Sequence, residues 1–418
     1  MDFPRMFRVR QRFESRRVEN VAAETQQQLA KLRLGDRIAR GQTVAITAGS
    51  RGIANIAAIT RAIVDHVKQL GGVPFIVPAM GSHGGGTAEG QTKILAGYGI
   101  TPETMGCELR ASMDTIIVDT TPQGIPVHFD QHASRADHVI VAGRVKPHTG
   151  FVGDVESGLH KMMLIGLGKH HGAKIYHRAI ANYSFMEIIT AVAESVIRKC
   201  RVAAGVAIVE NAYDETALIE AVPPELFLKR ETELLKLASE WLPKLPFDHC
   251  DLLIIDRIGK NISGTGMDTN VIGRKFNDHA ATPKDRANCR RIMVRGLTKE
   301  THGNATGIGM AEFANQRTID AVDRKITAIN CITGLHPTAA MLPIAFDTDR
   351  ETIAAALQTI GLIEPPDAKV IQIADTLHLA ECLVSEAYLP LLDGRGELTA
   401  LEAPREMAFD ADDNLVAV

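Results

Sequence analysis

The sequence lacks the features that mark several protein classes. No apolar run approaches the roughly 18 residues that a membrane-spanning helix needs. Basic residues are not in excess, because 46 Lys and Arg stand against 50 Asp and Glu and give a net charge of −4. This balance excludes a generally basic, phosphate-coating surface, so nucleic acid is not an expected partner. We see no secretory signal and expect a cytoplasmic protein with no membrane contact.

The sequence also lacks paired cysteines. Its six cysteines form no CxxC motif, and they lie far apart at positions 107, 200, 250, 289, 331 and 382. This spacing favours free thiols in a reducing compartment over a disulfide framework.

What the sequence does contain is the pattern of an α/β protein. Its 418 residues are enough for two or three domains. In the N-terminal half, an apolar strand at 43–47 is followed by an amphipathic helix at 53–70 and a second strand at 73–77. Strands that are apolar throughout predict a mostly parallel sheet covered on both faces. The pattern adds a helix at 87–98 and strands at 116–118, 125–129 and 138–142.

Two prolines within residues 242–246 end a predicted helix at 225–242 and suggest a domain boundary. We therefore predict two α/β domains, 1–246 and 247–418, each with a mostly parallel sheet. For the second domain the pattern predicts strands at 251–255, 291–294, 327–333 and 369–374, and helices near 352–360 and 377–389.

Ligands of such sheets bind at the carboxyl ends of the strands, and two early strand-end loops carry suitable residues. Residues 48–52 include Arg51, which suits capture of a carboxylate or phosphate. A solvated loop arginine is the alternative, and the sequence of this loop alone favours it. Residues 81–89 contain His83 and three consecutive glycines, followed by Thr87 as the cap of a helix. A helix N-terminus favours an anion, although a flexible turn before a capped helix is the alternative. No Gly-Lys-Ser/Thr ending follows, so this is not a nucleotide P-loop.

The densest set of reactive residues lies further along the chain. Eight of the fifteen histidines fall between 128 and 177, and His148 directly follows Pro147. Lys161 begins the apolar run 162–167, where partial desolvation would lower its pKa and make it a usable nucleophile. The alternatives are ordinary surface or core histidines and a lysine that extends to solvent. Three glycines at 166–172 imitate a dinucleotide-binding loop only faintly, and no zinc spacing is present.

The order and spacing of these residues resemble the nickel-dependent lactate racemase family, whose racemases and epimerases carry a nickel-pincer nucleotide. The matching elements are Arg51, Gly81-Ser82-His83, Pro147-His148, Lys161 and His177, and His177 lies 16 positions after Lys161. Two differences stand out. Ala48 occupies a position where the family usually has Asp, and the interval from His148 to Lys161 is longer than expected, so His160 and Lys169 remain rivals for nearby roles.

The resemblance implies a role for each matching residue. Lys161 would hold the cofactor covalently, and His177 would bind its nickel, which imidazole suits. His83 and His148 would be the acid–base pair beside the substrate, and Arg51 would bind anionic groups of substrate or cofactor. The expected cofactor-binding set is completed by Ser50, Gly84, Gly85 and Thr87.

A glycine-rich loop in the second half follows the strand predicted at 251–255. The family has substrate-contacting polar residues there, including a lysine, and the candidates in this chain are Lys260, Asn270, Arg274 and Lys275. Because no single lysine aligns, the resemblance implies a substrate other than lactate. A hinge loop is the alternative interpretation.

Together these features predict a racemase or epimerase of a 2-hydroxy acid, with its active site in a cleft between the domains. One histidine would take the hydroxyl proton while the α-hydrogen leaves as hydride to the cofactor, and the second histidine would act on the other face. Expected partners are the substrate and proteins of cofactor biosynthesis. A divalent-metal hydrolase or lyase, a nicotinamide-dependent oxidoreductase and a non-catalytic binding protein remain alternatives.

Overall fold

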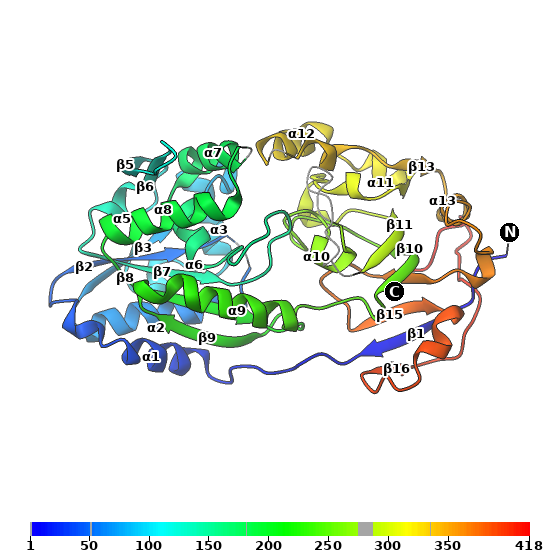
Figure 1. Cartoon of the computed structure of the whole chain (residues 1–418), viewed down its shortest axis with the longest axis horizontal. Coiled ribbons are helices and arrows are strands. Elements are labelled where there is room, and N and C mark those ends of the chain that lie inside the picture. The colour runs from blue at the N-terminus through cyan, green and yellow to red at the C-terminus, as the bar shows by residue number, and fades with distance from the viewer. Residues whose placement is uncertain (1, 51, 181, 275–286, 335) are drawn as a thin grey trace. The chain divides into compact units, whose positions relative to one another are not determined.

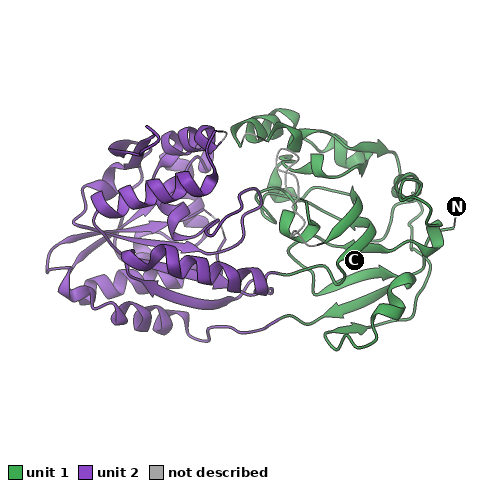
Figure 2. Cartoon of the chain, viewed as in Figure 1, with its two compact units in different colours: residues 1–13, 243–418 green, residues 14–242 purple. Residues whose placement is uncertain are grey.

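The computed structural model describes residues 2–50, 52–180, 182–274, 287–334 and 336–418. The chain divides into two compact units (Figure 2). The N-terminal unit comprises Glu14–Leu242, and the C-terminal unit comprises Met1–Phe13 together with Pro243–Val418. Within the described residues, no helix has the length and apolar character needed to cross a bilayer.

The first residues of the chain depart from the predicted division at 246. Strand β1 (Met6–Gln11) belongs to the C-terminal unit, because it pairs antiparallel with both β15 (Glu381–Ser385) and β16 (Leu398–Ala400). Phe7 and Val9 are fully buried in the core of that unit. Residues 1–13 were predicted in the N-terminal domain, but they contribute a strand to the C-terminal unit.

The N-terminal unit is built on a six-stranded sheet in the order β4-β3-β2-β7-β8-β9, in which only β9 runs antiparallel to its neighbour. The strands are β2 (Thr43–Ala48), β3 (Val73–Pro78), β4 (Glu108–Leu109), β7 (His138–Arg144), β8 (Val202–Glu210) and β9 (Thr216–Val222). The helices are α1 (Val21–Lys31), α2 (Ile56–Gln69), α3 (Ala88–Gly97), α4 (Pro102–Met105), α5 (Gln131–Ser134), α6 (Leu159–Lys161), α7 (Lys169–Ile180), α8 (Phe185–Lys199) and α9 (Phe227–Trp241).

Helices cover both faces of this sheet (Figure 1). Apolar side chains form one core on each face. Alternate residues of β2 point to opposite faces, so Val44 and Ile46 pack against α2, while Ala45 lies in the core that includes α8 and α9. The prediction of a mostly parallel sheet covered on both sides is thus confirmed.

The two strands predicted at 116–118 and 125–129 do not join that sheet. They form a separate antiparallel hairpin of β5 (Thr115–Thr120) and β6 (Pro126–Asp130). The connection between them is too short for the crossover that parallel strands require.

The C-terminal unit contains an eight-stranded sheet in the order β13-β12-β11-β10-β14-β15-β1-β16. Strands β10 to β14 pair in parallel, and the remaining neighbours are antiparallel. The further strands are β10 (His249–Ile255), β11 (Asn288–Val294), β12 (Phe313–Asn315), β13 (Ile344–Phe346) and β14 (Val370–Ile373). The helices are α10 (Thr269–Ile272), α11 (Gln316–Asp320), α12 (Arg324–Thr333) and α13 (Asp349–Leu357).

Two sequence predictions for this unit were wrong. Residues 327–333 are part of α12 rather than a strand, because Asp323 caps the helix through the amide of Ile326 at 2.9 Å. Residues 377–389 were predicted as a helix, but β15 lies there because pairing with β1 and β14 outweighs local propensity.

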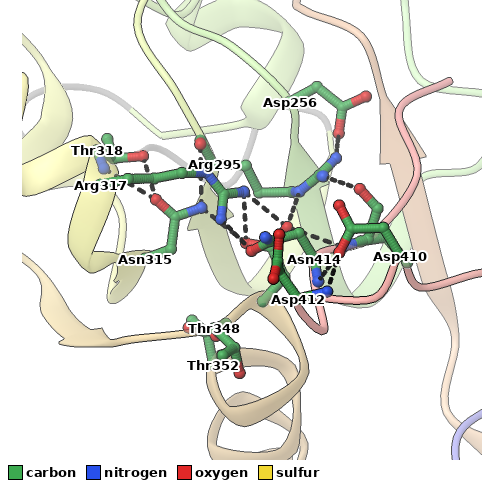
Figure 3. A network of polar contacts seen from close by, with 12 residues as sticks. Asp256, Arg295, Asn315, Arg317, Thr318, Thr348, Thr352, Asp410, Asp412 and Asn414 are labelled. Carbon is green, nitrogen blue, oxygen red and sulfur yellow. Dashed lines mark hydrogen bonds and ion pairs between the residues drawn. The ribbon is translucent and has the colours of Figure 1, made fainter.

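A buried ionic network fixes the last residues of the chain to the sheet (Figure 3). Asp349 is fully buried and accepts a hydrogen bond from Arg295 at 2.8 Å. Its two carboxylate oxygens also accept from one terminal nitrogen of Arg317, at 2.9 and 2.8 Å. Its Oδ2 also accepts from the amide of Leu415 at 3.0 Å. Arg295 is paired with Asp256 as well, so one connected set of charges joins three strand ends to the chain's final segment.

We expect Asp349→Asn to lower the free energy of unfolding by about 3–5 kcal/mol at neutral pH, because it leaves the buried Arg295 undercompensated and weakens the pair with the more exposed Arg317. Burial alone would raise the pKa of Asp349, but Arg295, Asn315 and Arg317 lower it overall. The stabilisation is therefore complete above an unfolded pKa of about 3.9 and is lost as the pH falls through the folded pKa. Urea unfolding at pH 7 and in acid measures this difference. Asp413→Asn, which breaks an exposed pair with Arg350, is the control and should cost about 0–1 kcal/mol.

Candidate active site

Three neighbouring parallel strands of the N-terminal unit bring the predicted residues to one edge of the sheet. Strand β2 has β3 on one side and β7 on the other, so the strand order reverses at β2. The loops that follow these three strands begin at Gly49, Ala79 and Val145. A crevice at the carboxyl ends of strands beside such a reversal is the usual ligand site of an open α/β sheet.

The loop after β3 has a backbone that only glycine adopts easily. Gly84, Gly85 and Gly86 all have φ between 66° and 68°. A Cβ on Gly84 would lie 2.6 Å from the amide nitrogen of Gln91, so this loop packs directly on α3. Thr87 caps α3 as predicted, accepting from the amide of Gly90 at 3.1 Å. The loop therefore packs on α3 and leads directly into its capped N-terminus.

His83 lies in that loop and is exposed. Its Nδ1 is hydrogen-bonded to the hydroxyl of Ser50, which follows β2. The buried side chain of Gln91 donates to the carbonyls of Gly81 at 3.0 Å and His83 at 3.3 Å, and Tyr98 donates to the carbonyl of Ser50 at 2.6 Å. The predicted residues Ser50 and His83 are thus in contact, and Gln91 and Tyr98 hold the backbone of their two loops through hydrogen bonds. Arg51, predicted to bind an anion, lies outside the described residues.

The central feature of the site is the ring of Phe151, on which three predicted residues converge. The ring of His148 stacks on it with centroids 4.4 Å apart, and His177 lies 5.9 Å away. The ammonium of Lys161 lies 5.9 Å from the same centroid. Phe151 is only 7% exposed and stacks in turn on Phe185 of α8 at 4.2 Å. These contacts bring the Pro-His segment, the lysine and the proposed metal ligand to one place.

The loop that carries His148 is closed by hydrogen bonds. Nδ1 of His148 accepts from the amides of Gly150 and Phe151, both at 3.0 Å. Glu156 accepts from the amides of His148 at 2.7 Å and Gly153 at 3.2 Å. Two donors at Nδ1 favour the neutral tautomer with its proton on Nε2, so the distal nitrogen of His148 is a proton donor in this state.

Lys161 ends α6, and the start of this helix is held by a buried acid. Glu231 of α9 accepts from the amide of His160 at 3.1 Å and from its ring Nδ1 at 2.7 Å. Burial raises the pKa of the Glu231 carboxyl. Gly158 precedes the helix with φ 106°, and a Cβ there would lie 2.5 Å from Glu231. This close approach explains the glycine and positions Lys161.

The two rival residues have structural partners. His160 is 3% exposed and is held by Glu231. Lys169 is fully buried and forms an ion pair with Asp130 at 2.8 Å. Lys161 is half-buried, so its side chain is less enclosed than that of Lys169. The structure therefore favours Lys161 over Lys169 as the reactive lysine.

His177 lies on α7 and is half-buried, whereas His170 and His171 on the same helix are exposed. Among the described side chains, no three His, Cys, Asp or Glu residues come close enough to hold a metal ion by themselves. A metal bound at His177 would therefore take further ligands from outside this set of side chains, a role that a cofactor can fill. The residues present fit such a group, since they supply one imidazole and a nearby lysine.

The predicted substrate residues of the C-terminal unit differ in how they are engaged. Lys260 donates to the carbonyl of Gly264 at 2.7 Å, and Asn270 donates to Asp268 at 2.9 Å within the same loop. Arg274 donates to Glu312 at 2.7 Å and to carbonyls of Cys289 and Met310, so its guanidinium ties this loop to β11 and β12. Lys275 lies outside the described residues.

Three residues that shape the site were missed by the sequence analysis. Phe151 and Glu156 lie in the segment between His148 and Lys161, and Glu231 lies about 70 residues further along the chain. The unusual length of that segment was the available signal for the first two. No local pattern distinguishes Glu231 from the other charges of its amphipathic helix.

A mostly parallel α/β unit with histidines and a lysine gathered at its strand ends defines a class of protein equipped for acid–base and covalent chemistry. Residues 15–187 match the family described as the lactate racemase N-terminal domain. The chain also resembles the lactate racemase apoprotein from Thermoanaerobacterium thermosaccharolyticum, at 13% identity and a TM-score of 0.54, over 87% of this chain and 93% of that one. Residues 15–187 are therefore similar to the lactate racemase N-terminal domain, and the solved structure shows that the fold of the chain is shared. No curated protein sequence matches it.

Proposed function

We propose that the protein is a racemase or epimerase that inverts C2 of a 2-hydroxy acid with a nickel-pincer nucleotide attached at Lys161. The match of residues 15–187 to the lactate racemase N-terminal domain supports racemase or epimerase activity in general. The observation that carries the finer proposal is the convergence of His148, Lys161 and His177 on the ring of Phe151.

In this proposal, separate residues bind the cofactor, bind the metal and transfer protons. Lys161 would hold the cofactor, and His177 would supply a nitrogen ligand to its nickel. When bound, the group supplies an acceptor for the α-hydrogen. His83 and His148 act only on the hydroxyl proton of the substrate, each from its own loop. The glycines at 84–86 and the capped start of α3 offer amide N–H groups to an anionic part of the cofactor.

The tautomer of His148 assigns it the donor role in the state described. Because Nδ1 accepts from two backbone amides, Nε2 would carry the proton and would return it to the substrate oxygen. His83 is exposed, and its Nδ1 contacts a serine hydroxyl that can either donate or accept. His83 can therefore take or give a proton at Nε2 by changing its hydrogen bond with Ser50. Two histidines in different loops suit a reaction whose two enantiomers present their hydroxyls in different directions.

We expect His177→Ala to lose most bound nickel while retaining the covalent adduct, because the cofactor is attached at a different residue. Metal analysis and intact mass of the purified holo-protein measure the two properties separately. His171→Ala, an exposed histidine on the same helix, is the control and should keep the metal. Full nickel retention in His177→Ala would remove His177 from the ligand set.

A further inference from the structure

The start of α7 carries a fully buried lysine in an unusual backbone conformation. Lys169 is the first residue of this helix and has φ 53°, in the left-handed region that side chains rarely adopt. Its side chain is fully buried, although lysine is almost never buried without a partner. A cation at the first position of a helix is also unfavourable in the field of the helix dipole. Local structure therefore opposes this placement, and contacts with other segments must stabilise it.

Two distant segments supply those contacts. Nζ of Lys169 forms an ion pair with Oδ2 of Asp130 at 2.8 Å, and both side chains are fully buried. The same nitrogen donates to the carbonyl of Pro78, which is the last residue of β3. Asp130 is the last residue of β6, and its other carboxylate oxygen caps α5 through the amide of Ala133 at 2.7 Å. One ammonium therefore ties the start of α7 to the ends of β3 and β6.

Close packing beside this lysine joins the loop that follows β3 to the segment that enters α7. A Cβ on Gly166 would lie 2.8 Å from the carbonyl oxygen of Ala79. A Cβ on Gly81 would lie 2.9 Å from the side chain of Ile165. Both distances are shorter than real Cβ contacts, so each segment has a glycine where the other approaches it. The loop after β3 is therefore packed directly against the residues that precede α7.

The helix that Lys169 begins also carries His177. His177 lies eight positions further along, about 12 Å at the rise of an α-helix. Its neighbour Tyr176 is fully buried, and the hydroxyl of Tyr176 accepts from the amide of His128 on β6 at 2.9 Å. The helix is thus held at its first residue and again beside His177. Both contacts fix the direction of α7, and with it the place of the His177 ring 5.9 Å from that of Phe151.

We propose that Lys169 is a positioning residue of the candidate active site, and that it fixes where His177 lies relative to the loop that carries His83. Lys169 acts through the helix and touches neither substrate nor cofactor. A buried ion pair stabilises a fold little more than apolar side chains of the same volume, so its removal together with its partner should change position more than stability. The consequence for nickel binding rests on the proposed function, whereas the placement of His177 is measurable without it.

The test removes both buried charges at once, because Lys169→Met alone leaves Asp130 buried without its partner, at a cost to folding. The double variant Lys169→Met, Asp130→Asn keeps a side-chain oxygen to cap α5 and loses the ammonium. In the full chain without cofactor, the NMR signals of the His177 ring, assigned through His177→Ala, should shift in this variant because the ring moves relative to Phe151. Lys174→Met changes an exposed lysine of the same helix and is the matched control, which should leave those signals unchanged.

Nickel retention distinguishes failure of this role from failure of the proposed function. In the holo-protein the double variant should keep the covalent adduct but hold nickel about tenfold more weakly in competition with a chelator, as is typical when a residue that orients a metal ligand is removed. Circular dichroism confirms that the variant is folded. A folded double variant whose His177 signals match those of the wild type would overturn the positioning role. Shifted His177 signals, in a protein whose wild-type form takes up neither adduct nor nickel, would leave the positioning role standing and overturn the proposed function.

Discussion

Lys161→Ala should abolish the covalent cofactor adduct and reduce racemisation to below about one-thousandth of the wild-type rate. A thousandfold loss corresponds to roughly 4 kcal/mol of transition-state stabilisation, which is a modest demand for removal of the group that holds the cofactor. The expectation depends on geometry, because Lys161 is the half-buried lysine beside Phe151 while Lys169 is locked in an ion pair with Asp130. Intact mass and peptide mapping of protein made together with the cofactor pathway measure the adduct.

Lys174→Ala is the matched control for this prediction. Lys174 is an exposed lysine on α7, the helix that carries His177, so its removal should change neither the mass adduct nor the rate. An adduct that persists in Lys161→Ala, or that maps to Lys169 or Lys174 in the wild type, would contradict the assignment. Circular dichroism of each variant separates loss of attachment from loss of folding.

His83→Ala and His148→Ala should each abolish interconversion of the enantiomers, by roughly 10²–10⁴-fold, because a positioned proton-transfer group typically contributes that much. Both variants should still carry the adduct and the nickel, since neither histidine holds the cofactor in this account. His83 is in an exposed loop and His148 in a loop closed by Glu156, so the two variants test two separately supported positions.

His170→Ala is the control for the histidine variants. His170 is exposed and lies close to Gly86, yet it is given no proton-transfer role here. If racemisation survives in His83→Ala but is lost in His170→Ala, then His170, and not His83, is the proton-transfer residue of this loop region. Loss of nickel in His148→Ala would instead show that this histidine acts on the metal.

The parts of the fold that local pattern determines were predictable from the sequence. Strands β2, β3 and β7 are short, apolar throughout and separated by helices or turns, and their carboxyl ends gather the histidine and lysine loops. Residues such as His83, His148 and Lys161 could be placed because each follows a recognisable strand or begins an apolar run. The convergence of His148, Lys161 and His177 on the ring of Phe151 could not be predicted, because it depends on contacts between distant segments.

The features that sequence reasoning missed depend on long-range pairing. Strand β1 pairs with strands more than 370 residues away, and no local signal marks that partner. The helix α12 exposes Ile329 and Ile332, at 57% and 64%, so its apolar residues do not mark a buried strand. From the sequence, Phe151 is indistinguishable from an ordinary core residue. Only the structure shows that His148, Lys161 and His177 lie beside its ring.

The most direct test of the central claim is the fate of the α-hydrogen during racemisation in heavy water. In the proposed mechanism His83 and His148 exchange only the hydroxyl proton, which equilibrates with solvent, while the α-hydrogen never becomes a solvent-exchangeable proton. The alternative is removal of the α-proton by the two histidines, which would need strong stabilisation of an enediolate. Mass spectrometry of the product should find the α-position still protiated, and substrate deuterated there should react more slowly and keep its label. Substantial incorporation of deuterium at the α-carbon during turnover would contradict the account and show a two-base proton-transfer enzyme.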